Sequence, residues 1–351
     1  MRRFHCQSCD TEVYFLNTTC VTCKRQLGYL PETFEMTALE PQGEALSALV
    51  VPARNVRHCQ NAHYEACNWL MPADCAHAYC IACRHNRTIP DLSMDSNLSN
   101  WRQIEQAKHQ LFYSLMRWRL PIAIPTYERS GLAFDFLADW IDGDGKTMLA
   151  LTGHDGGVIT INVAEGDDAV REQRRLAMRE PYRTLLGHFR HEIGHFYWDV
   201  LVRGGKRIDR FRELFGDETT DYPSALQHHY EQGPPEGWKD AFISSYATTH
   251  PWEDFAETWA HYTHIVDSLE TAQAYGMTVS AGGVGPVRET AVQFRPYAAD
   301  GATDIIDAWI PFTVALNSIN RSMGQRDFYP FVLSPPVMAK LQFVHEIIHG
   351  K

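Results

Sequence analysis

Apolar residues recur at helical spacing in the chain after residue 100. Ile104, Leu111, Leu115 and Trp118 lie seven, four and three residues apart, which predicts a single helical face. Asn100 is a residue type that caps helices and Pro121 is one that ends them, so we expect this helix between the two. Further helical patterns cover residues 182–203, 251–275, 303–322 and 336–349.

Short runs rich in β-branched and aromatic residues lie between the first of these helices and the others. They cover residues 132–138, 147–151 and 158–163, and Gly-Asp and Gly-Gly turns separate them. A small sheet followed by helices is an α+β arrangement, and this is the fold class that we predict.

All nine cysteines of the chain lie within its first 83 residues. Two residues separate Cys6 from Cys9 and Cys20 from Cys23, and each such pair can present two thiolates to one tetrahedral Zn²⁺. A thioredoxin-like redox pair is the alternative, but it needs one CxxC at the start of a helix in a βαβ unit. Neither pair has that setting, so the four cysteines predict a structural zinc.

A second set of cysteines is less regular, because only Cys80 and Cys83 are two residues apart. Cys59 and Cys67 complete a possible set of four, although buried free cysteines are also ordinary core residues. Cys75 is left over. We favour a second structural zinc, in which a nearby histidine can replace a cysteine; the candidates are His58, His63, His77 and His85.

These patterns divide the chain into three predicted parts. Residues 1–30, with short polar strands around the first two cysteine pairs and Gly28 at the end, indicate a zinc ribbon. Residues 31–90 hold a connector that contains proline and glutamate, followed by the second cysteine-rich segment. Residues 91–351 hold the predicted sheet and helices.

Composition and charge exclude several classes of protein. Hydrophobic residues make up 44% of the 351 residues and charged residues 21%, which excludes a disordered, collagen-like or coiled-coil chain. The net charge is −11, and the acidic excess lies in residues 91–351 because charges balance before them. Since no basic stripe is present, we expect no nucleic-acid partner.

The sequence predicts neither a membrane span nor a secretory signal. The longest mainly apolar stretch, Ala308–Leu316, contains a proline and is about half as long as a bilayer-spanning helix. The N-terminal residues Met1–Cys6 carry positive charge but lack the apolar region of a signal peptide. We therefore expect a cytoplasmic protein.

An HExxH motif, His191-Glu192-Ile193-Gly194-His195, lies inside one predicted helix. Residues four apart are one helical turn apart, so His191 and His195 can converge on one ion. Glu192 can then reach a water bound to the metal without itself becoming a ligand, which is the position of a general base.

A second HExxH string, His345-Glu346-Ile347-Ile348-His349, lies at the end of the sequence. Since only two residues follow it, no third ligand can come from further along the chain. A histidine in the last turn of a helix is also favoured by the helix dipole. We therefore expect this second string to be coincidental.

A third ligand is available after the first motif, on the helix that Pro251 begins. Glu253 and Glu257 lie one turn apart on that helix, so Glu253 can bind the metal while Glu257 orients a histidine ligand. A solvated helix face is the alternative for such a pair, but the upstream motif favours the ligand assignment.

Other histidines are less suitable as ligands. His261 and His264 lie about 12 and about 16 Å past Glu253 along an unbroken helix, too far to share its ion. His188 is better placed to contact a ligand or solvent than the metal. His154 and His250 are candidates for substrate contact.

Several strings of the chain together resemble a family of bacterial zinc-binding metallopeptidases that carry an N-terminal zinc ribbon. They are Phe4-x-Cys6-x2-Cys9, Cys67-Asn68-Trp69, Cys80-x2-Cys83-Arg84, Arg87-Thr88-Ile89-Pro90-Asp91-Leu92, His188-Phe189-Arg190-His191-Glu192-Ile193-Gly194-His195 and Pro251-Trp252-Glu253-Asp254. The resemblance covers nearly the whole chain. It implies a zincin-like peptidase domain, with a small sheet and active-site helices, preceded by zinc-ribbon modules.

The predicted active site also resembles that of anthrax lethal factor-like gluzincins. Their pattern places a tyrosine seven residues before the glutamate ligand and Phe-Ala-Glu after it, and Tyr246, Glu253 and Phe255-Ala256-Glu257 match those positions. The resemblance implies that Glu253 is a ligand and that Tyr246 stabilises an oxyanion. It covers only the site, and Trp252 and Asp254 depart from the pattern, so no substrate follows from it.

The predicted function is zinc-dependent hydrolysis of peptide bonds in a protein or peptide substrate. Glu192 would take a proton from a zinc-activated water and return it to the leaving amine. We also expect residues 158–163 to form an edge strand along which an extended substrate pairs. Zinc is the only cofactor predicted, with one catalytic ion and one or two structural ions.

Two other functions remain open at this level. The same metal site can hydrolyse an amide bond in a compound that is not a peptide. Alternatively, the chain is a non-catalytic adaptor that binds a protein partner through its zinc ribbon. The combination of Glu192, Glu253 and Tyr246 argues against the adaptor.

Overall fold

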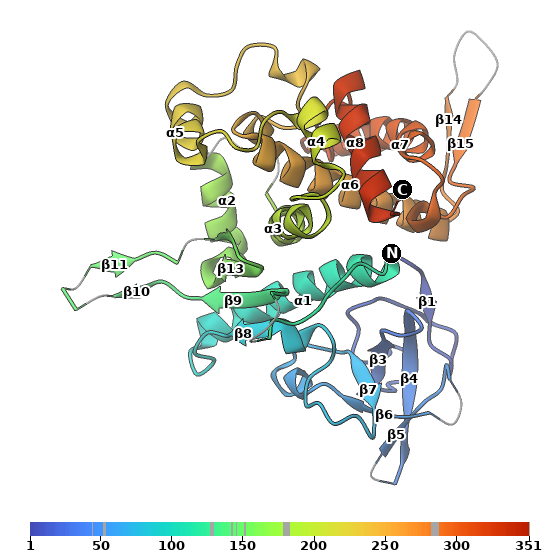
Figure 1. Cartoon of the computed structure of the whole chain (residues 1–351). Helices are drawn as coiled ribbons and strands as arrows, with labels where there is room; N and C mark the ends of the chain where they lie inside the picture. The colour runs from blue at the N-terminus through green and yellow to red at the C-terminus, as the bar shows by residue number, and fades with distance from the viewer. Residues whose placement is uncertain are drawn as a thin grey trace. The chain divides into compact units, whose positions relative to one another are not determined.

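The computed structural model describes residues 1–43, 45–51, 54–126, 130–141, 143–144, 146–150, 152–177, 183–281 and 288–350. The chain forms two compact units (Figure 1). One unit consists of residues 3–189, and the other consists of residues 1–2 and 190–351. Both contain helices and strands, so the predicted α+β class is confirmed.

The N-terminal part of the unit 3–189 contains two antiparallel arrangements. Strands β1 (Phe4–His5) and β2 (Glu12–Val13) pair with each other beside the first cysteines. A five-stranded sheet follows in the order β3-β4-β5-β6-β7. Its strands are β3 (Leu27–Leu30), β4 (Glu35–Gln42), β5 (Ala45–Ala48), β6 (Asn55–His58) and β7 (Leu70–Pro72).

The segment predicted as a connector therefore contributes β4 and β5 to a sheet. Leu39 and Ala48, from these two strands, are buried with Leu30, Val56 and Leu70 from the other three. The glutamates and the proline of the segment indicate a linker, but the burial of the consecutive residues 36–39 and of Ala48 places it in the sheet.

A second, four-stranded sheet has the order β12-β13-β9-β8. Its strands are β8 (Asn86–Thr88), β9 (Ala133–Leu137), β12 (Gly153–Asp155) and β13 (Val158–Asn162). The predicted strands at 132–138 and 158–163 are confirmed. The predicted strand 147–151 is represented by β11 (Thr147–Met148), which pairs with β10 (Trp140–Ile141), while Leu151 lies outside the described residues.

The prediction that residues 158–163 form an edge strand is wrong. Strand β13 pairs with β9 in parallel along one side and with β12 in antiparallel register along the other. Its backbone groups are therefore used inside the sheet. The Gly156-Gly157 turn folds β12 back against β13, with both glycines at positive φ, and this hairpin takes the position that a substrate would need.

Helix α1 (Asp95–Arg117) connects the parallel strands β8 and β9. It packs on the sheet through Phe112, whose ring centroid lies 6.0 Å from that of Phe134. The prediction that Asn100 caps this helix is wrong, because the helix begins at Asp95 with an acidic first turn. It ends at Arg117, ahead of Pro121, where Arg119 adopts a left-handed conformation. Helix α2 (Asp168–Ala177) follows the sheet.

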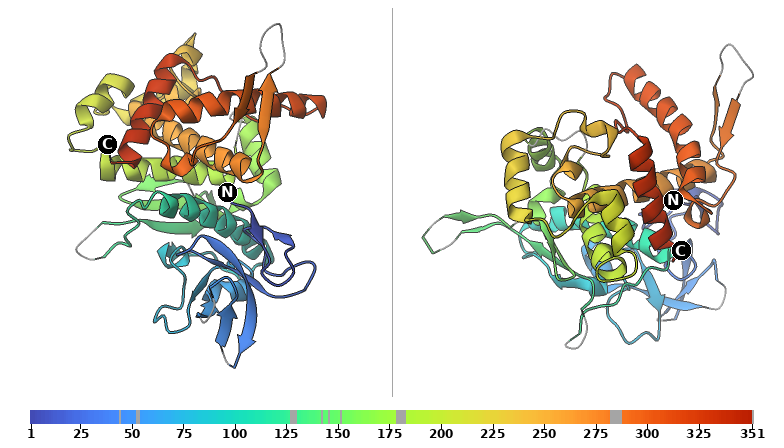
Figure 2. Two further views of the ribbon diagram at one scale, coloured as in Figure 1. Left: turned by 90° about the vertical axis from the view of Figure 1, so that its right-hand side faces the viewer. Right: turned by 45° about the horizontal axis from the view of Figure 1, so that its top comes forward.

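The unit that contains residues 190–351 is built around α6 (Pro251–Ala274), which is buried along most of its length. Figure 2 shows α6 beside α7 (Ala302–Ser322) and α8 (Pro335–Ile348). The unit also contains α4 (Ile208–Phe215), α5 (Tyr222–Gln232), the hairpin of β14 (Thr278–Ala281) and β15 (Arg288–Ala291), and the part of α3 (Leu185–Leu201) that begins at Arg190.

The long helices predicted from the sequence are confirmed with small changes at their ends. Residue 182, where the predicted helix 182–203 begins, lies outside the described residues. Within the unit, α3 packs closely on α6, since Tyr197 stacks on Trp259 with ring centroids 5.0 Å apart. Gly194 allows this approach, because a Cβ atom at that position would lie 2.9 Å from the Cα atom of Ala256.

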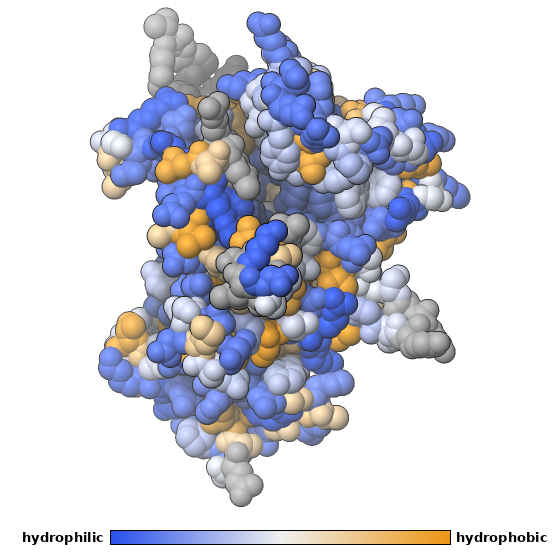
Figure 3. All heavy atoms as spheres, turned by 90° about the vertical axis from the view of Figure 1, so that its left-hand side faces the viewer, coloured by the Kyte–Doolittle hydropathy of each residue, from blue (hydrophilic) through white to orange (hydrophobic). Residues whose placement is uncertain are grey.

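Among the helices in the described residues, none combines the length and the apolar character of a membrane span. The face drawn in Figure 3 is mostly hydrophilic, with hydrophobic residues in small separate patches.

Candidate metal centres

The two histidines of the first HExxH motif lie one turn apart on α3 and face the start of α6. Their Nε2 atoms are 3.2 Å apart. Oε2 of Glu253, in the first turn of α6, lies 2.9 Å from Nε2 of His191 and 3.4 Å from Nε2 of His195. The structure thus brings together the three residues that the sequence suggested as ligands.

The donor atoms of this group fit a zinc ion. Tetrahedral zinc with nitrogen and oxygen ligands places its donor atoms about 3.3 Å from one another. The side chain of Glu253 is only 2% exposed, and its Oε2 accepts no hydrogen bond from the described residues. A buried carboxylate oxygen beside two imidazole nitrogens is a favourable position for a cation.

The start of α6 fixes the position of Glu253. Pro251 occupies the first turn, and the side chain of His250 caps the helix by accepting a hydrogen bond from the backbone N–H of Trp252. Nε2 of His250 lies 3.2 Å from the backbone oxygen of Thr220. His250, a candidate for substrate contact, is therefore a buried helix cap.

Glu257 orients His191 from one turn further along α6. Its Oε1 lies 2.7 Å from Nδ1 of His191, and its Oε2 accepts a hydrogen bond from the hydroxyl of Ser244. Burial opposes ionisation, but the hydrogen bond with His191 holds the pKa of Glu257 below its usual value. With Nδ1 donating to this carboxylate, Nε2 of His191 is left with its lone pair toward the candidate metal position.

Glu192 follows His191 on α3 and is half-buried. Burial raises the pKa of its carboxyl, although His191 and His195 attract the charged form. A carboxylate with a raised pKa beside a metal position is suited to accept a proton and release it again.

Two tyrosines lie at the candidate metal centre. The ring of Tyr246 lies 5.8 Å from that of His191, and burial raises the pKa of its hydroxyl, so the hydroxyl stays protonated. Tyr222, at the start of α5, donates a hydrogen bond to Oε1 of Glu253 over 2.6 Å. Tyr222 is not predicted from the sequence, because Asp221 and Pro223 indicate the start of a helix but no local pattern shows where Tyr222 points.

The other histidines of this unit have different partners. His261 lies 2.8 Å from the hydroxyl of Tyr329, and His264 contacts Arg190. Neither is part of the group of three candidate ligands.

Two further histidines lie in the unit 3–189. His154 accepts a hydrogen bond from the backbone N–H of Gly157, and His188 lies 3.6 Å from Glu165. Both contacts are local to that unit.

The second HExxH string lies at the end of α8, and its last residue, His349, caps the helix. His345 is fully buried and lies 2.8 Å from the hydroxyl of Tyr262, and its ring packs against that of His349. Glu346 accepts a hydrogen bond from Gln342 of the same helix. Within the described part of the chain, these residues join no group with metal-binding geometry.

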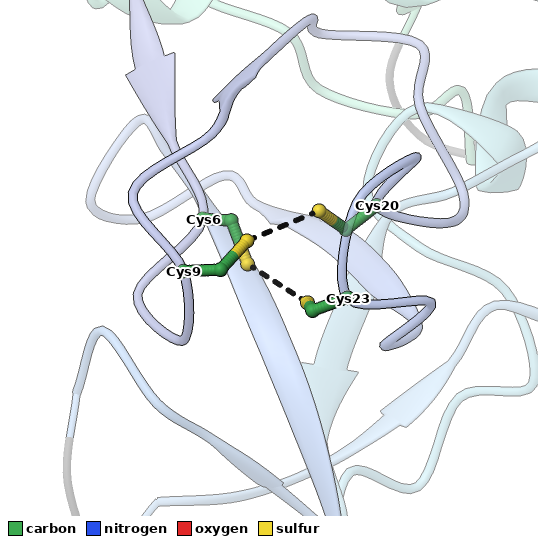
Figure 4. A group of neighbouring side chains, drawn as sticks. All are labelled: Cys6, Cys9, Cys20 and Cys23. Carbon is green, nitrogen blue, oxygen red and sulfur yellow. Dashed lines mark hydrogen bonds between the residues drawn. The ribbon is translucent and has the colours of Figure 1, made fainter.

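The first cysteine pairs form one cluster near the N-terminus. The sulfur atoms of Cys6 and Cys23 are 3.6 Å apart, as are those of Cys9 and Cys20 (Figure 4). Tetrahedral zinc with thiolate ligands places sulfur atoms about 3.8 Å apart. Both pairs use the same turn, in which the residue after the second cysteine, Asp10 or Lys24, has a positive φ.

The second cysteine set also converges. Cys59, Cys67, Cys80 and Cys83 are all buried, and their sulfur atoms lie within 4.8 Å of one another. The leftover Cys75 accepts a hydrogen bond at its backbone oxygen from Arg57. His58, His63, His77 and His85 lie outside this group, so none of them replaces a cysteine among the described residues.

Comparisons with known proteins match two separate parts of the chain. A family model described as "Putative zinc-binding metallo-peptidase" matches residues 97–347, and a zinc-ribbon domain model matches residues 3–94. Uncharacterized proteins of Mycobacterium bovis and Mycobacterium tuberculosis are 41% identical over 351 residues, which is 99% of this chain and 95% of each relative. No solved structure matches the chain. The resemblance of the sequence to zinc-binding metallopeptidases with an N-terminal zinc ribbon is confirmed.

Proposed function

Because the chain belongs to the zinc-binding metallo-peptidase family, we propose that it hydrolyses peptide bonds in a protein or peptide substrate. The observation that carries the proposal is the convergence of His191, His195 and Glu253 on one point, with Glu192 beside them. Two histidines and a glutamate, with an open fourth position, are the ligand set of a catalytic zinc. The residue pattern is that of a gluzincin.

The chemistry divides between the metal and the side chains around it. Zinc held by these three residues supplies a Lewis acid, which increases the acidity of water and polarises the scissile carbonyl. Glu192 accepts a proton from the attacking water and donates it to the nitrogen of the leaving amine, so the carboxylate is restored at the end of each cycle.

Tyr246 is proposed as the second catalytic residue. Its protonated hydroxyl donates a hydrogen bond to the oxygen of the scissile carbonyl as negative charge develops there. Glu257 and Tyr222 act through the ligands, by holding His191 and Glu253 in place.

The cysteine clusters are proposed as structural sites. A site closed by four protein side chains leaves no open position for a substrate, so zinc bound in either cluster would contribute to folding. The ribbon is also the surface that we propose for a protein partner.

The direct test is cleavage of a proteome-derived peptide library by the purified protein, read by mass spectrometry. We expect new peptide ends with the wild type and none with Glu192→Gln, which should still bind zinc. The matched control is Glu346→Gln, which makes the same change in the second HExxH string and should leave cleavage intact. Retained cleavage by Glu192→Gln would contradict its role as the base.

A zinc count per chain tests the metal site without any substrate. We expect His195→Ala to bind one zinc ion fewer than the wild type, while His349→Ala, its counterpart in the second string, binds the full number. An unchanged zinc content in His195→Ala would remove the basis for a peptidase and favour an adaptor.

A further inference from the structure

His109 is a buried histidine on α1 that faces the second cysteine set. Its Nε2 lies 3.2 Å from the sulfur of Cys67, 3.6 Å from that of Cys83 and 3.9 Å from that of Cys80. No sequence pattern relates His109 to the cysteines, because it lies outside the cysteine-rich segment.

The other ring nitrogen of His109 determines what Nε2 presents to the sulfurs. Nδ1 lies 2.6 Å from the backbone oxygen of Glu105, one turn earlier on α1. A carbonyl oxygen only accepts hydrogen bonds, so Nδ1 carries the proton and donates it. In a neutral ring, Nε2 then has a lone pair, which points at the cysteine sulfurs. Histidine ligands of metals commonly have this arrangement, with the other ring nitrogen donating a hydrogen bond to a carbonyl oxygen.

The distances fit a tetrahedral site made of three sulfurs and one nitrogen. In such a zinc site, nitrogen lies about 3.6 Å from each sulfur, and the sulfurs lie about 3.8 Å apart. The distances from Nε2 of His109 to the three sulfurs, 3.2, 3.6 and 3.9 Å, lie around the expected nitrogen–sulfur distance. The sulfurs of Cys67 and Cys80 are 3.8 Å apart, as expected for two thiolate ligands.

The surroundings hold His109 in this position. The ring of Trp69 packs edge-on against it, with centroids 5.0 Å apart. On the same helix, Lys108 and Glu105 form a fully buried ion pair of 2.7 Å, and Glu105 also contacts the sulfur of Cys83 over 3.5 Å. A neutral histidine ligand buries one negative charge fewer beside Glu105 than a fourth thiolate does.

We propose that His109 is a ligand of the second metal ion, together with Cys67, Cys80 and Cys83. Cys59 is then the one cysteine of the set that is not a ligand, although its sulfur lies within 4.8 Å of the other three and accepts a hydrogen bond from the backbone N–H of Cys80. His109 lies beyond the region matched by the zinc-ribbon model and inside the region matched by the peptidase model. The metal would therefore join the cysteine-rich segment to α1, the helix that crosses between β8 and β9.

Cadmium NMR of the full chain tests the ligand directly. The protein is loaded with ¹¹³Cd²⁺ and labelled with ¹⁵N at histidine, and one-bond coupling between ¹¹³Cd and a histidine nitrogen is recorded. We expect a coupled resonance that disappears in His109→Ala and persists in His58→Ala, a control at a histidine next to Cys59. If the wild type shows no coupling to His109, the proposal is wrong, whatever the variants do.

Metal counts give a second, independent test that needs no peptidase activity. We expect Cys59→Ser to bind as many metal ions as the wild type, and Cys67→Ser and His109→Ala to bind one fewer. His109→Cys restores a thiolate at the same place and should recover the count. Loss of one ion from Cys59→Ser with no loss from His109→Ala would overturn the assignment, and neither result depends on the HExxH site.

Discussion

Tyr222 and Glu253 are joined by a hydrogen bond in which the tyrosine hydroxyl donates to Oε1 of the glutamate over 2.6 Å. The bond connects the start of α5 to the first turn of α6. It occupies one carboxylate oxygen and leaves the other, Oε2, facing His191 and His195. Tyr222 therefore determines which oxygen of Glu253 is available to a metal.

Replacing Tyr222 by Phe should weaken zinc binding at this site. The loss of a hydrogen bond to a buried carboxylate costs about 1.5–3 kcal/mol. Removing a hydrogen-bond partner of a metal ligand commonly weakens metal binding about 10-fold to 100-fold. Competition with a zinc-binding dye measures the change. The expected result is a zinc Kd raised about tenfold or more.

Tyr246→Phe is the companion variant, and it should behave differently. Because Tyr246 is proposed to contact the substrate oxygen, we expect kcat to fall by about 10²–10³ while zinc affinity stays the same. If Tyr246→Phe weakened zinc binding and left kcat per bound zinc intact, the roles of the two tyrosines would be exchanged.

Glu257→Gln should also act on the metal rather than on the substrate. The ionised carboxylate accepts a hydrogen bond from Nδ1 of His191, and a neutral amide holds that ring less firmly. We expect about 10-fold to 100-fold weaker zinc binding, measured by the same competition. An unchanged zinc Kd would show that Glu257 is not needed to orient His191.

Gly194→Ala should destabilise the packing of α3 on α6. The new methyl group would meet the backbone of Ala256 at 2.9 Å, a contact that requires the helices to separate. Overpacking of this kind typically costs about 1–3 kcal/mol of unfolding free energy, and denaturant titration measures it. Gly205→Ala is the control, since its methyl group would lie at an ordinary 3.4 Å from the backbone oxygen of Val202. Equal stability of the two variants would contradict the argument.

Asp254 and Lys340 form a buried ion pair between α6 and α8, with 2.5 Å between Nζ and Oδ2. Burial raises the pKa of Asp254 to about 7, against the attraction of Lys340. Lys340→Met leaves the carboxylate buried without its cation, so we expect a loss of about 3–5 kcal/mol in unfolding free energy. The double variant Asp254→Asn with Lys340→Met should recover part of that loss. Additive effects of the two changes would show that the pair is not coupled.

The pairs of site residues that lie on one helix could be predicted from the sequence, because the helical repeat alone places the two members of each pair on the same face. His191 and His195 lie one turn apart, as do Glu253 and Glu257, and a proline marks the start of the second helix. Asp254, which departs from the gluzincin pattern, has its explanation in Lys340, a residue far away in the sequence.

What the sequence did not show depends on contacts between distant segments. Tyr222 reaches Glu253, and His109 reaches three cysteines, across separations that no short pattern encodes. The position of β13 inside its sheet depends on β12 folding back beside it. The sequence predicts a connector where β4 and β5 lie, because the burial of residues 35–48 depends on strands that lie before and after them.

Helix α6 carries Glu253, Asp254 and Glu257 within two turns. Glu253 and Glu257 contact opposite nitrogens of His191 on α3, whereas Asp254 contacts Lys340 on α8. Their directions are fixed relative to one another, because each residue turns the helix by about 100°. A single inserted residue between Asp254 and Glu257 would rotate Glu257 away from His191 by that angle. The length of this segment should therefore be invariant among related chains, and gaps in their alignments should fall outside it.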